Sequence, residues 1–285
     1  MANKVGKLSK SGHIEAEPAV EIDRDASSSL AKALSILDLF SENKPIWTTN
    51  EILDALGATR STGYRYIRAL TSAGLLGAVG NGYYVLGSRI IELDLLIRNT
   101  DPLLKASEGI LGELVKATTH SALLCMLFQN SLVCIADCQT QFSPKTIFAR
   151  GQRRPLFKGA VSRVVLANLP NHRLRSIFAR RQDAILEARL GDSWEEFNEA
   201  MSKIRSEGFV KSIGEFNPGI VGIAAPVFNG EDAIIGSVGV SWEEEEIEDI
   251  DINRTVLLVK RAAREISQRM AKSDSELILP PRAVG

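Results

Sequence analysis

Apolar residues near the start of the chain recur at helical spacing in three short segments. The first follows serines 27–29, which can cap a helix, and its expected buried stripe consists of Leu30, Ala33, Leu34, Leu37 and Phe40. The second covers residues 50–56, between threonine caps and Gly57, and the third covers residues 60–73 and ends at Gly74. Three short helices with a glycine turn between the last two predict a helix-turn-helix.

The hydrophobic period changes after the third segment. Residues 75–86 read LLGAVGNGYYVL, where strand-like positions flank Asn81 and Gly82, a pair that accepts the positive φ angles of a type I′ turn. This hairpin is the expected wing of a winged helix-turn-helix. Residues 88–100 then form a strongly apolar helical run with little polar face, which predicts a linker helix that pairs subunits.

The remainder of the chain mixes helical and strand patterns in no strict βαβ order. A helix is expected from Asp101-Pro102 to about residue 118, and Ser193 with Glu196 predicts a capping box at another helix. The other expected helices cover residues 160–167, 194–207 and 249–270, and the expected strands cover 121–129, 132–138, 220–228 and 233–242. Antiparallel hairpins with helices at the side predict an α+β domain.

The composition fits a globular protein of about two domains, because 45% of the 285 residues are hydrophobic and 24% are charged. No segment approaches the roughly 20 apolar residues needed to cross a bilayer, and the first residues lack the apolar core of a signal peptide. A cytoplasmic protein without a membrane partner is therefore expected. Residues 1–26 are expected to form a flexible arm, and residues 273–285 a loose tail.

Cysteine and histidine positions predict neither a metal site nor a cofactor. Cys125, Cys134 and Cys138 contain no CxxC pair, which argues against a disulfide framework and a structural zinc site. Cys134 and Cys138 are expected on one face of a strand, with Cys125 opposite them, as small buried residues. The three histidines are dispersed along the chain, with no ligand spacing between them.

The net charge is −1, so any indication of a nucleic-acid partner has to come from the distribution of charge. Between Ala55 and Ile91 no Asp or Glu occurs, and the formal charges are those of Arg60, Arg65, Arg68 and Arg89. A basic segment in a nearly neutral protein is typical of a DNA-facing module.

The third helix, RSTGYRYIRAL at residues 60–70, has the side chains of a recognition helix. With Ile67 and Leu70 facing inward, the polar residues of its first half face solvent, where arginine can pair with guanine edges. Gly63 indicates close approach to a neighbouring group. An ordinary solvated helix face is the alternative, but the preceding helix, the acid-free segment and the wing favour DNA binding. The expected DNA-binding residues are Thr49, Arg60, Ser61, Thr62, Tyr64, Arg65, Arg68, Asn81 and Tyr83.

From Leu30 to about Gln268 the chain resembles an IclR-type transcriptional regulator. The resemblance is carried by KALSILDLF, TTNEILDALGATRSTGYRYIRAL, GLL, GYYVLGSRI, DPLL, RGQRRPLFKGA, IRSEGF, GEFNPGIVGIAAPVF and SVGVS, in the family's order. It implies a winged helix-turn-helix over residues 27–87, a linker helix over 88–100 and a GAF-like α+β domain over 101–272 that binds a small effector. It also implies homodimers that can pair into homotetramers, with a double-stranded DNA operator as partner.

Two segments of the C-terminal domain suggest where a small molecule binds. A helix that begins at Gly159-Ala160 would present free backbone N–H groups to a carboxylate. Gly219 and Gly222 remove side chains from a strand, which leaves room for a ligand or, alternatively, marks a bulge or a tight sheet contact. The resemblance implies a cavity lined by Gly159, Ala160, Ser212, Ile220, Gly222, Gly239 and Ser241.

The sequence departs from the family pattern at Phe157, at Ser162-Arg163 and at Trp242, where His, Gly-Lys and Gly-Pro are common in the family. These departures imply a more aromatic and less polar pocket, and they leave open whether the effector is a short aliphatic acid or an aromatic acid.

Two classes of function follow from these patterns. The first is a sequence-specific transcriptional regulator controlled by a small organic or aromatic acid. The alternative is a small-acid enzyme of GAF-like fold with a DNA-binding appendage. No GxSxG motif, phosphate loop or nucleophile-base pair is present, so no catalytic residue is predicted and the regulator is favoured.

Overall fold

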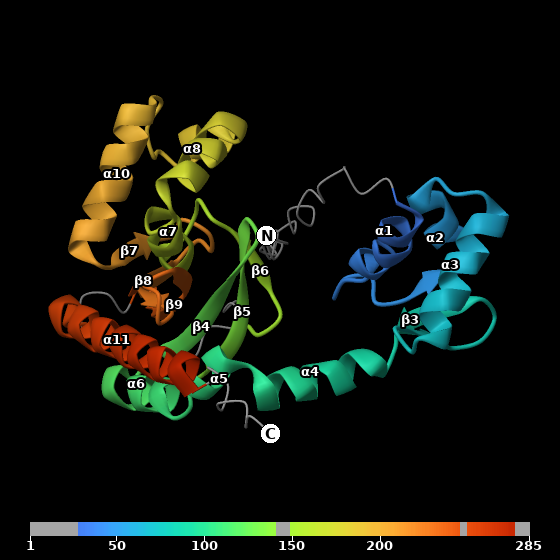
Figure 1. The fold of residues 1–285 in the computed structure, drawn as a ribbon, viewed down its shortest axis with the longest axis horizontal. Helices are drawn as coiled ribbons and strands as arrows, with labels where there is room; N and C mark the ends of the chain where they lie inside the picture. Colours follow the sequence, from blue (N-terminus) through green and yellow to red (C-terminus); the bar gives the residue numbers. More distant parts are fainter. Residues whose placement is uncertain (1–27, 141–148, 246–249, 277–285) are drawn as a thin grey trace, which may run out of the picture. The chain divides into compact units, whose positions relative to one another are not determined.

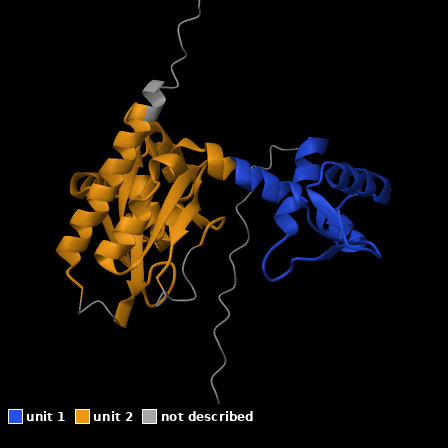
Figure 2. Cartoon of the chain, turned by 90° about the horizontal axis from the view of Figure 1, so that it is seen from below, with its two compact units in different colours: residues 1–96 blue, residues 97–285 orange. Residues whose placement is uncertain are grey.

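The structure, a computed structural model, describes residues 28–140, 149–245 and 250–276. The chain divides into two compact units, residues 1–96 and 97–285 (Figure 2). Helix α4 (Arg89–Thr100) crosses this boundary. The predicted arm lies outside the described residues, and so does the predicted tail from residue 277 onward.

The first unit combines short helices with a small antiparallel sheet of strand order β1-β3-β2. Its elements before α4 are α1 (Ser29–Leu34), the 3-10 helix η1 (Leu37–Leu39), β1 (Trp47–Thr48), α2 (Thr49–Leu56), α3 (Arg60–Ser72), β2 (Leu76–Ala78) and β3 (Tyr83–Leu86). Hydroxyl groups cap the helices, because the side chains of Ser28, Thr48 and Thr59 accept backbone N–H groups at the starts of α1, α2 and α3. This unit is a winged helix-turn-helix.

The first helix is shorter than its hydrophobic pattern predicted. α1 ends at Leu34 and the chain continues through η1, so the helical period does not extend to Phe40. Leu30 and Leu34 are therefore 68% and 44% exposed, whereas Ile36 is fully buried. The prediction of a buried stripe is wrong at both leucines, because Ile36 takes the core position after the chain changes direction.

Helices α2 and α3 approach each other closely at Gly63. A Cβ atom at Gly63 would stand 1.8 Å from Cδ2 of Leu53, a buried residue of α2. The glycine at position 63 predicted close approach to a neighbouring group, and that group belongs to α2. Gly57 ends α2 with a φ of 56°, a left-handed conformation that glycine adopts without steric cost.

The wing contains the turn predicted from Asn81-Gly82. The φ angles of these residues are 47° and 75°, both positive as a type I′ turn requires. The carbonyl of Gly80 accepts the N–H of Tyr83 at 2.9 Å and closes the turn.

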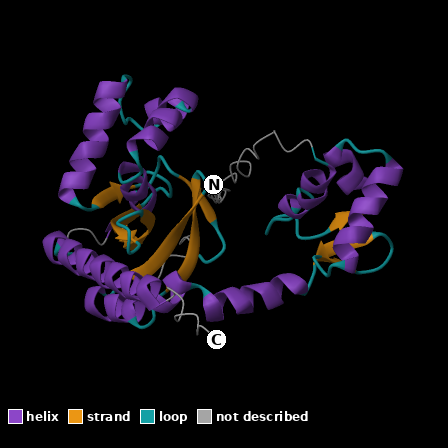
Figure 3. Cartoon of the chain, in the orientation of Figure 1, coloured by secondary structure: helices purple, strands orange, loops and turns teal. Residues whose placement is uncertain are grey.

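The second unit is an α+β domain built on an antiparallel sheet of order β6-β5-β4-β9-β8-β7 (Figure 1). Its strands are β4 (Ser121–Phe128), β5 (Ser131–Cys138), β6 (Arg153–Pro155), β7 (Val210–Ile213), β8 (Ile220–Phe228) and β9 (Ile234–Glu243). Its helices are α5 (Pro102–Ala106), α6 (Ile110–Thr118), α7 (Ala160–Ala167), α8 (Asn171–Arg180), α9 (Gln182–Glu187), α10 (Trp194–Glu207) and α11 (Ile252–Glu276). Figure 3 shows helices on both sides of these strands.

Each face of the sheet packs against its own group of helices. The core on one face joins the sheet to α7, α8, α9 and α10, and the core on the other face joins it to α5, α6 and α11. Along β8, Val221 and Ile223 belong to the α11 core, whereas Ala224 belongs to the α7 core. Small residues on the α7 face bring that helix close to the sheet, where Ser237 Oγ donates to the carbonyl of Val161 at 2.9 Å.

Two helix starts differ from the prediction. The helix expected from Pro102 to residue 118 is broken at Gly109, whose φ of 78° separates α5 from α6. At α10, Ser193 Oγ accepts the N–H of Glu196 as expected, but the Glu196 carboxylate accepts the N–H of Asp192 at 3.0 Å. The predicted capping box is therefore only half formed, because the Glu196 carboxylate accepts from Asp192 and not from Ser193, the N-cap residue.

The remaining differences are in the positions and number of elements. α11 begins at Ile252 and continues to Glu276, into the predicted tail, because residues 271–276 contain neither the proline nor the glycine that would end a helix. Five elements were not predictable from the pattern of apolar residues, because their segments are short or carry many charges: α8, α9, β1, β6 and β7.

The two cysteines of β5 lie on opposite faces of the sheet. The β4–β5 register pairs Leu124 with Ala136 but Cys125 with Cys134, so Ile135 is an extra residue. Cys134 consequently lies with Cys125 in the α7 core, whereas Cys138 packs against the α11 core. The expectation that Cys134 and Cys138 share a face is wrong because this irregularity interrupts the alternation. Burial raises the pKa of the Cys125 thiol well above its usual value, which keeps it in the thiol form.

Candidate functional site

Helix α3 presents its polar first half to solvent. Its buried residues attach it to the core of the first unit, and they are Gly63, Tyr66, Ile67 and Leu70. Its exposed residues include five of the predicted DNA-binding residues, which are Arg60, Ser61, Tyr64, Arg65 and Arg68. Within the part of the chain that the structure describes, no carboxylate pairs with any of these three arginines. Their positive charges are therefore available to another molecule.

The other predicted DNA-binding residues differ in exposure. Asn81 is exposed at the wing turn, and Tyr83 beside it is 45% exposed. Thr62 is partly buried, and its hydroxyl oxygen accepts from Thr59 Oγ1 at 3.1 Å. Thr49 is buried and its hydroxyl donates to the carbonyl of Gly82 at 3.2 Å, so this side chain holds α2 against the wing.

Helix α4 carries an exposed apolar surface. Ile91, Leu95 and Leu96 are 74%, 58% and 57% exposed, and no residue of α4 is buried. Arg89, the fourth arginine of the basic segment, pairs with Glu92 of the same helix at 2.6 Å. A helix of this kind needs a partner surface, because clustered exposed apolar side chains mark interaction sites.

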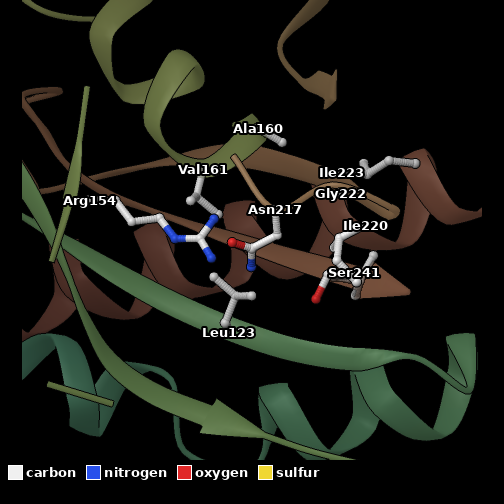
Figure 4. A pocket seen from close by; sticks show the side chains of 10 residues that line it. Leu123, Arg154, Ala160, Val161, Asn217, Ile220, Gly222, Ile223 and Ser241 are labelled. Carbon is white, nitrogen blue, oxygen red and sulfur yellow. The ribbon is translucent and has the colours of Figure 1, made fainter. Parts of the chain in front are cut away.

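A cavity of about 50 Å³ lies in the second unit between the start of α7, the β4–β9–β8 part of the sheet and the segment before β8 (Figure 4). Its wall is formed by Leu123, Arg154, Ala160, Val161, Asn217, Ile220, Gly222, Ile223, Val240 and Ser241. Four of the seven residues predicted to line a cavity are among them, namely Ala160, Ile220, Gly222 and Ser241.

The three other predicted lining residues lie close to this wall or within the sheet. Ser212 Oγ accepts the N–H of Ala160 at 3.0 Å, and Gly159 directly precedes that residue. A Cβ atom at Gly239 would stand 2.7 Å from the carbonyl oxygen of Ile223. Glycine at position 239 therefore permits close contact between β8 and β9.

The start of α7 differs from its expected role in one respect. Free backbone N–H groups were expected at Gly159 and Ala160, but both groups have partners within the chain. Gly159 donates to Glu215 Oε2 at 2.9 Å, and the other oxygen of Glu215 accepts from Arg163 at 2.5 Å. The prediction is wrong because a carboxylate from the segment before β8 already occupies this helix start.

Arg154 is the charged side chain of the cavity wall, and no pattern in the sequence singled it out. Its guanidinium lies over the Phe216 ring, 4.2 Å from the ring centroid. Burial lowers the pKa of Arg154 to about 10. Figure 4 shows the guanidinium and the carboxamide of Asn217 pointing toward one another. Arg154 thus remains protonated at neutral pH and makes this part of the wall positive.

Metal-binding and membrane-spanning features are not found among the described residues. No three His, Cys, Asp or Glu side chains there form a group that could hold a metal ion. No described helix is both long enough and apolar enough to cross a membrane.

A winged helix-turn-helix with exposed arginines defines the class of protein as a DNA-binding regulator. Two family matches identify that class further. Residues 29–79 match the IclR helix-turn-helix domain, and residues 97–268 match the family described as bacterial transcriptional regulator IclR C-terminal. The chain therefore belongs to the IclR family of transcriptional regulators, and it is a regulator and not an enzyme.

Individual relatives agree with the family match. HTH-type transcriptional regulator KdgR of Escherichia coli is 24% identical over 251 residues, which cover 88% of this chain and 95% of that protein. HTH-type transcriptional regulator KipR of Bacillus subtilis is 22% identical, over 87% of this chain and 98% of that protein. The crystal structure of an IclR homologue from Microbacterium hydrocarbonoxydans, complexed with 4-hydroxybenzoate, has a TM-score of 0.69 at 18% identity. It covers 86% of this chain and all of that chain.

Proposed function

We propose that this regulator changes its affinity for an operator when a small organic acid binds in the cavity beneath α7. The observation that carries the proposal is the charge of the cavity wall. Among the ten described residues that line it, Arg154 bears the formal charge and the rest are apolar or neutral. A wall of this kind favours an anion with an apolar body, because a partly buried cation is stabilised by a negative partner.

The size of the cavity favours a short aliphatic acid over an aromatic one. At about 10 to 15 Å³ for each water position, 50 Å³ corresponds to about four water molecules. A three-carbon acid is close to this size, whereas a benzoate ring is larger. The structural relative from Microbacterium hydrocarbonoxydans is complexed with 4-hydroxybenzoate, so the test compares aromatic acids with short ones.

Helix α3 is the proposed recognition helix, which binds in the major groove of the operator. Arg65 and Arg68 are exposed on one side of this helix and can reach base edges or phosphates. A homodimer joined through the apolar surface of α4 would present two such helices, and its two-fold symmetry predicts a pseudo-palindromic operator. Pairing of dimers into tetramers, implied by the family resemblance, is compatible with this arrangement.

Control by the acid requires that it bind more tightly to one arrangement of the dimer than to the other. The resulting coupling free energy is typically about 1 to 3 kcal/mol, which changes operator affinity about 5- to 150-fold. The direction of that change decides whether the acid releases the operator or strengthens its binding.

The test uses the full chain and duplexes that it selects from a random pool. Fluorescence anisotropy would measure operator affinity with pyruvate, lactate, benzoate and 4-hydroxybenzoate, at constant salt because phosphate contacts make affinity salt-dependent. We expect at least one acid, and a short one before an aromatic one, to change the affinity at least about fivefold. Unchanged operator affinity and unchanged thermal stability with all four acids would contradict the proposal.

A further inference from the structure

A groove with a volume of about 320 Å³ lies in the second unit between α11, β8 with the turn that follows it, and the end of α10. It shares no lining residue with the cavity beneath α7. Helices α7 and α11 pack on opposite faces of the sheet (Figure 1). The volume falls in the range of about 300 to 1,000 Å³ that is typical of sites for small organic ligands. This groove can therefore hold a larger molecule than the cavity can.

The groove follows an uncovered edge of β8. Strand β7 pairs with β8 as far as Val210 opposite Ala224, so among the described residues no strand lies beside positions 225–228 on that side. Pro226 has no N–H group, and the N–H of Phe228 donates to Ser267 Oγ at 3.0 Å. An added peptide strand needs backbone donors as well as acceptors at such an edge. The edge thus disfavours a peptide as the occupant and favours a small organic molecule.

Apolar side chains form the base of the groove. Ala225 and Ala263, where β8 meets α11, are 1% and 3% exposed, and Pro226 and Phe228 beside them are half-buried. The two alanines are small, so they leave space that larger side chains would fill. A ligand with an apolar body would bury its surface against these residues.

Two cations of α11 line the same groove. Lys260 and Arg264 are four residues apart, which places them on one face of the helix. Arg264 is exposed, and no carboxylate among the described residues pairs with it. Lys260 Nζ donates to the carbonyl of Glu207 at 2.8 Å, a neutral partner that leaves its charge uncompensated. Asp232 is the one acid among the described lining residues, so two positive charges stand against one negative charge.

We propose that this groove binds a monocarboxylate with a bulky apolar body, such as a phenyl-substituted acid, at a site separate from the cavity beneath α7. The planar N–H fork of Arg264 would pair with the carboxylate, and the charge of Lys260 would strengthen the attraction. The apolar body would lie against Ala225, Phe228 and Ala263. A second carboxylate would meet the charge of Asp232, and like charges at short range disfavour binding. This assignment is independent of the proposed function.

Arg261 offers a matched control on the same helix. It is exposed, belongs to α11 and does not line the groove. Arg261→Gln and Arg264→Gln remove the same charge from the same helix, and only the second removes the proposed carboxylate partner.

The experiment compares an acid with its neutral amide on the full chain. Calorimetry would follow 3-phenylpropanoate and 3-phenylpropanamide in the wild type and in Arg264→Gln, Arg264→Lys and Arg261→Gln. In the wild type and Arg261→Gln we expect the acid to bind at least about tenfold more tightly than the amide. Arg264→Gln should lose at least about tenfold for the acid and almost nothing for the amide. Arg264→Lys keeps the charge without the planar fork, so its acid affinity should lie between these values.

Two further measurements separate the groove from the cavity beneath α7. Saturating pyruvate should leave the affinity of the wild type for 3-phenylpropanoate unchanged. Gly222→Leu, which fills the cavity, should still bind 3-phenylpropanoate. Displacement by pyruvate, or loss of binding in Gly222→Leu, would place the acid in the cavity and overturn the assignment.

Equal acid affinity in the wild type and Arg264→Gln would also overturn it. The same holds for a lower sedimentation mass of Arg264→Gln, because the groove would then hold a second copy of this chain. Failure of pyruvate to bind, with 3-phenylpropanoate bound in the wild type and lost in Arg264→Gln, would count against a short acid in the cavity and support the groove as a site of its own.

Discussion

Gly222 can be enlarged in two steps that test whether the cavity is the effector site. A methyl group at this position would lie 3.5 Å from Ser212 Oγ, 3.6 Å from Ala160 Cβ and 3.7 Å from the carbonyl oxygen of Val240, which are ordinary contact distances. Gly222→Ala should therefore fit without strain and raise stability by about 0.5 to 1 kcal/mol, because glycine weakens a strand interior by that amount. Gly222→Leu should fill the cavity of about 50 Å³ and cost about 1 to 3 kcal/mol through overpacking.

The effect on ligand binding can be worked out from the same geometry. At a concentration 100 times its Kd, an acid adds about 2.7 kcal/mol to the free energy of unfolding. For a unit of this size that corresponds to an increase in Tm of about 5 to 10 °C. Gly222→Ala should reduce this increase and Gly222→Leu should abolish it, while both variants still bind the operator. The assays are thermal unfolding with pyruvate and operator binding without it.

Two further glycines supply the comparison. Gly112 has nothing within 4 Å of its Cβ position, so Gly112→Ala should leave the acid-induced increase in Tm unchanged. A methyl at Gly239 would stand 2.7 Å from the Ile223 carbonyl oxygen, so Gly239→Ala should lower Tm without ligand. An undiminished increase in Tm in a folded Gly222→Leu variant would refute the placement of the effector in this cavity.

Four other predictions concern the first unit and the oligomer. Gly63→Ala should destabilise the unit by about 1 to 2 kcal/mol in chemical denaturation, because the clash with Leu53 outweighs the helix propensity gained, and higher stability would contradict the packing. Thr48→Ala should cost about 0.5 to 2 kcal/mol through loss of the α2 cap, and a neutral result would contradict that role. The backbone N–H of Thr48 donates to the Glu51 carboxylate and holds the pKa of Glu51 at about 2. The stability that the ionised carboxylate contributes should therefore be complete above pH 4.5 and lost as pH falls toward 2, as measured by unfolding at a series of acidic pH values. Leu96→Glu should shift sedimentation toward monomer, whereas unchanged mass would exclude α4 as the dimer surface.

The helix-turn-helix was predictable because its signals are local. Each signal depends only on neighbours within a few residues, as for the N-cap at Thr48, the glycine C-cap at Gly57 and the Asn81-Gly82 turn. The same reasoning failed at Leu30 and Leu34, because the end of α1 depends on how the chain turns over the core of the unit.

The cavity was only partly predictable because its wall joins distant segments. Gly222 and Ala160 stood out as a glycine within a strand and a residue at a helix start, and both line the cavity. Arg154 and Asn217 gave no such signal, since one lies in a basic run before a proline and the other in a turn sequence. The bond from Gly159 to Glu215 spans 56 residues, so only the folded chain shows that the helix start is occupied.

The measurement that tests the central claim most directly is operator binding by Arg65→Ala and Arg68→Ala. Fluorescence anisotropy with a duplex selected by the wild-type chain should show a loss of about 1 to 3 kcal/mol for an arginine that reads a base, with unchanged Tm. Arg261→Ala, at an exposed position of α11 in the second unit, is the matched control and should bind as the wild type does. Wild-type affinity in both α3 variants would contradict the assignment of α3 as the recognition helix.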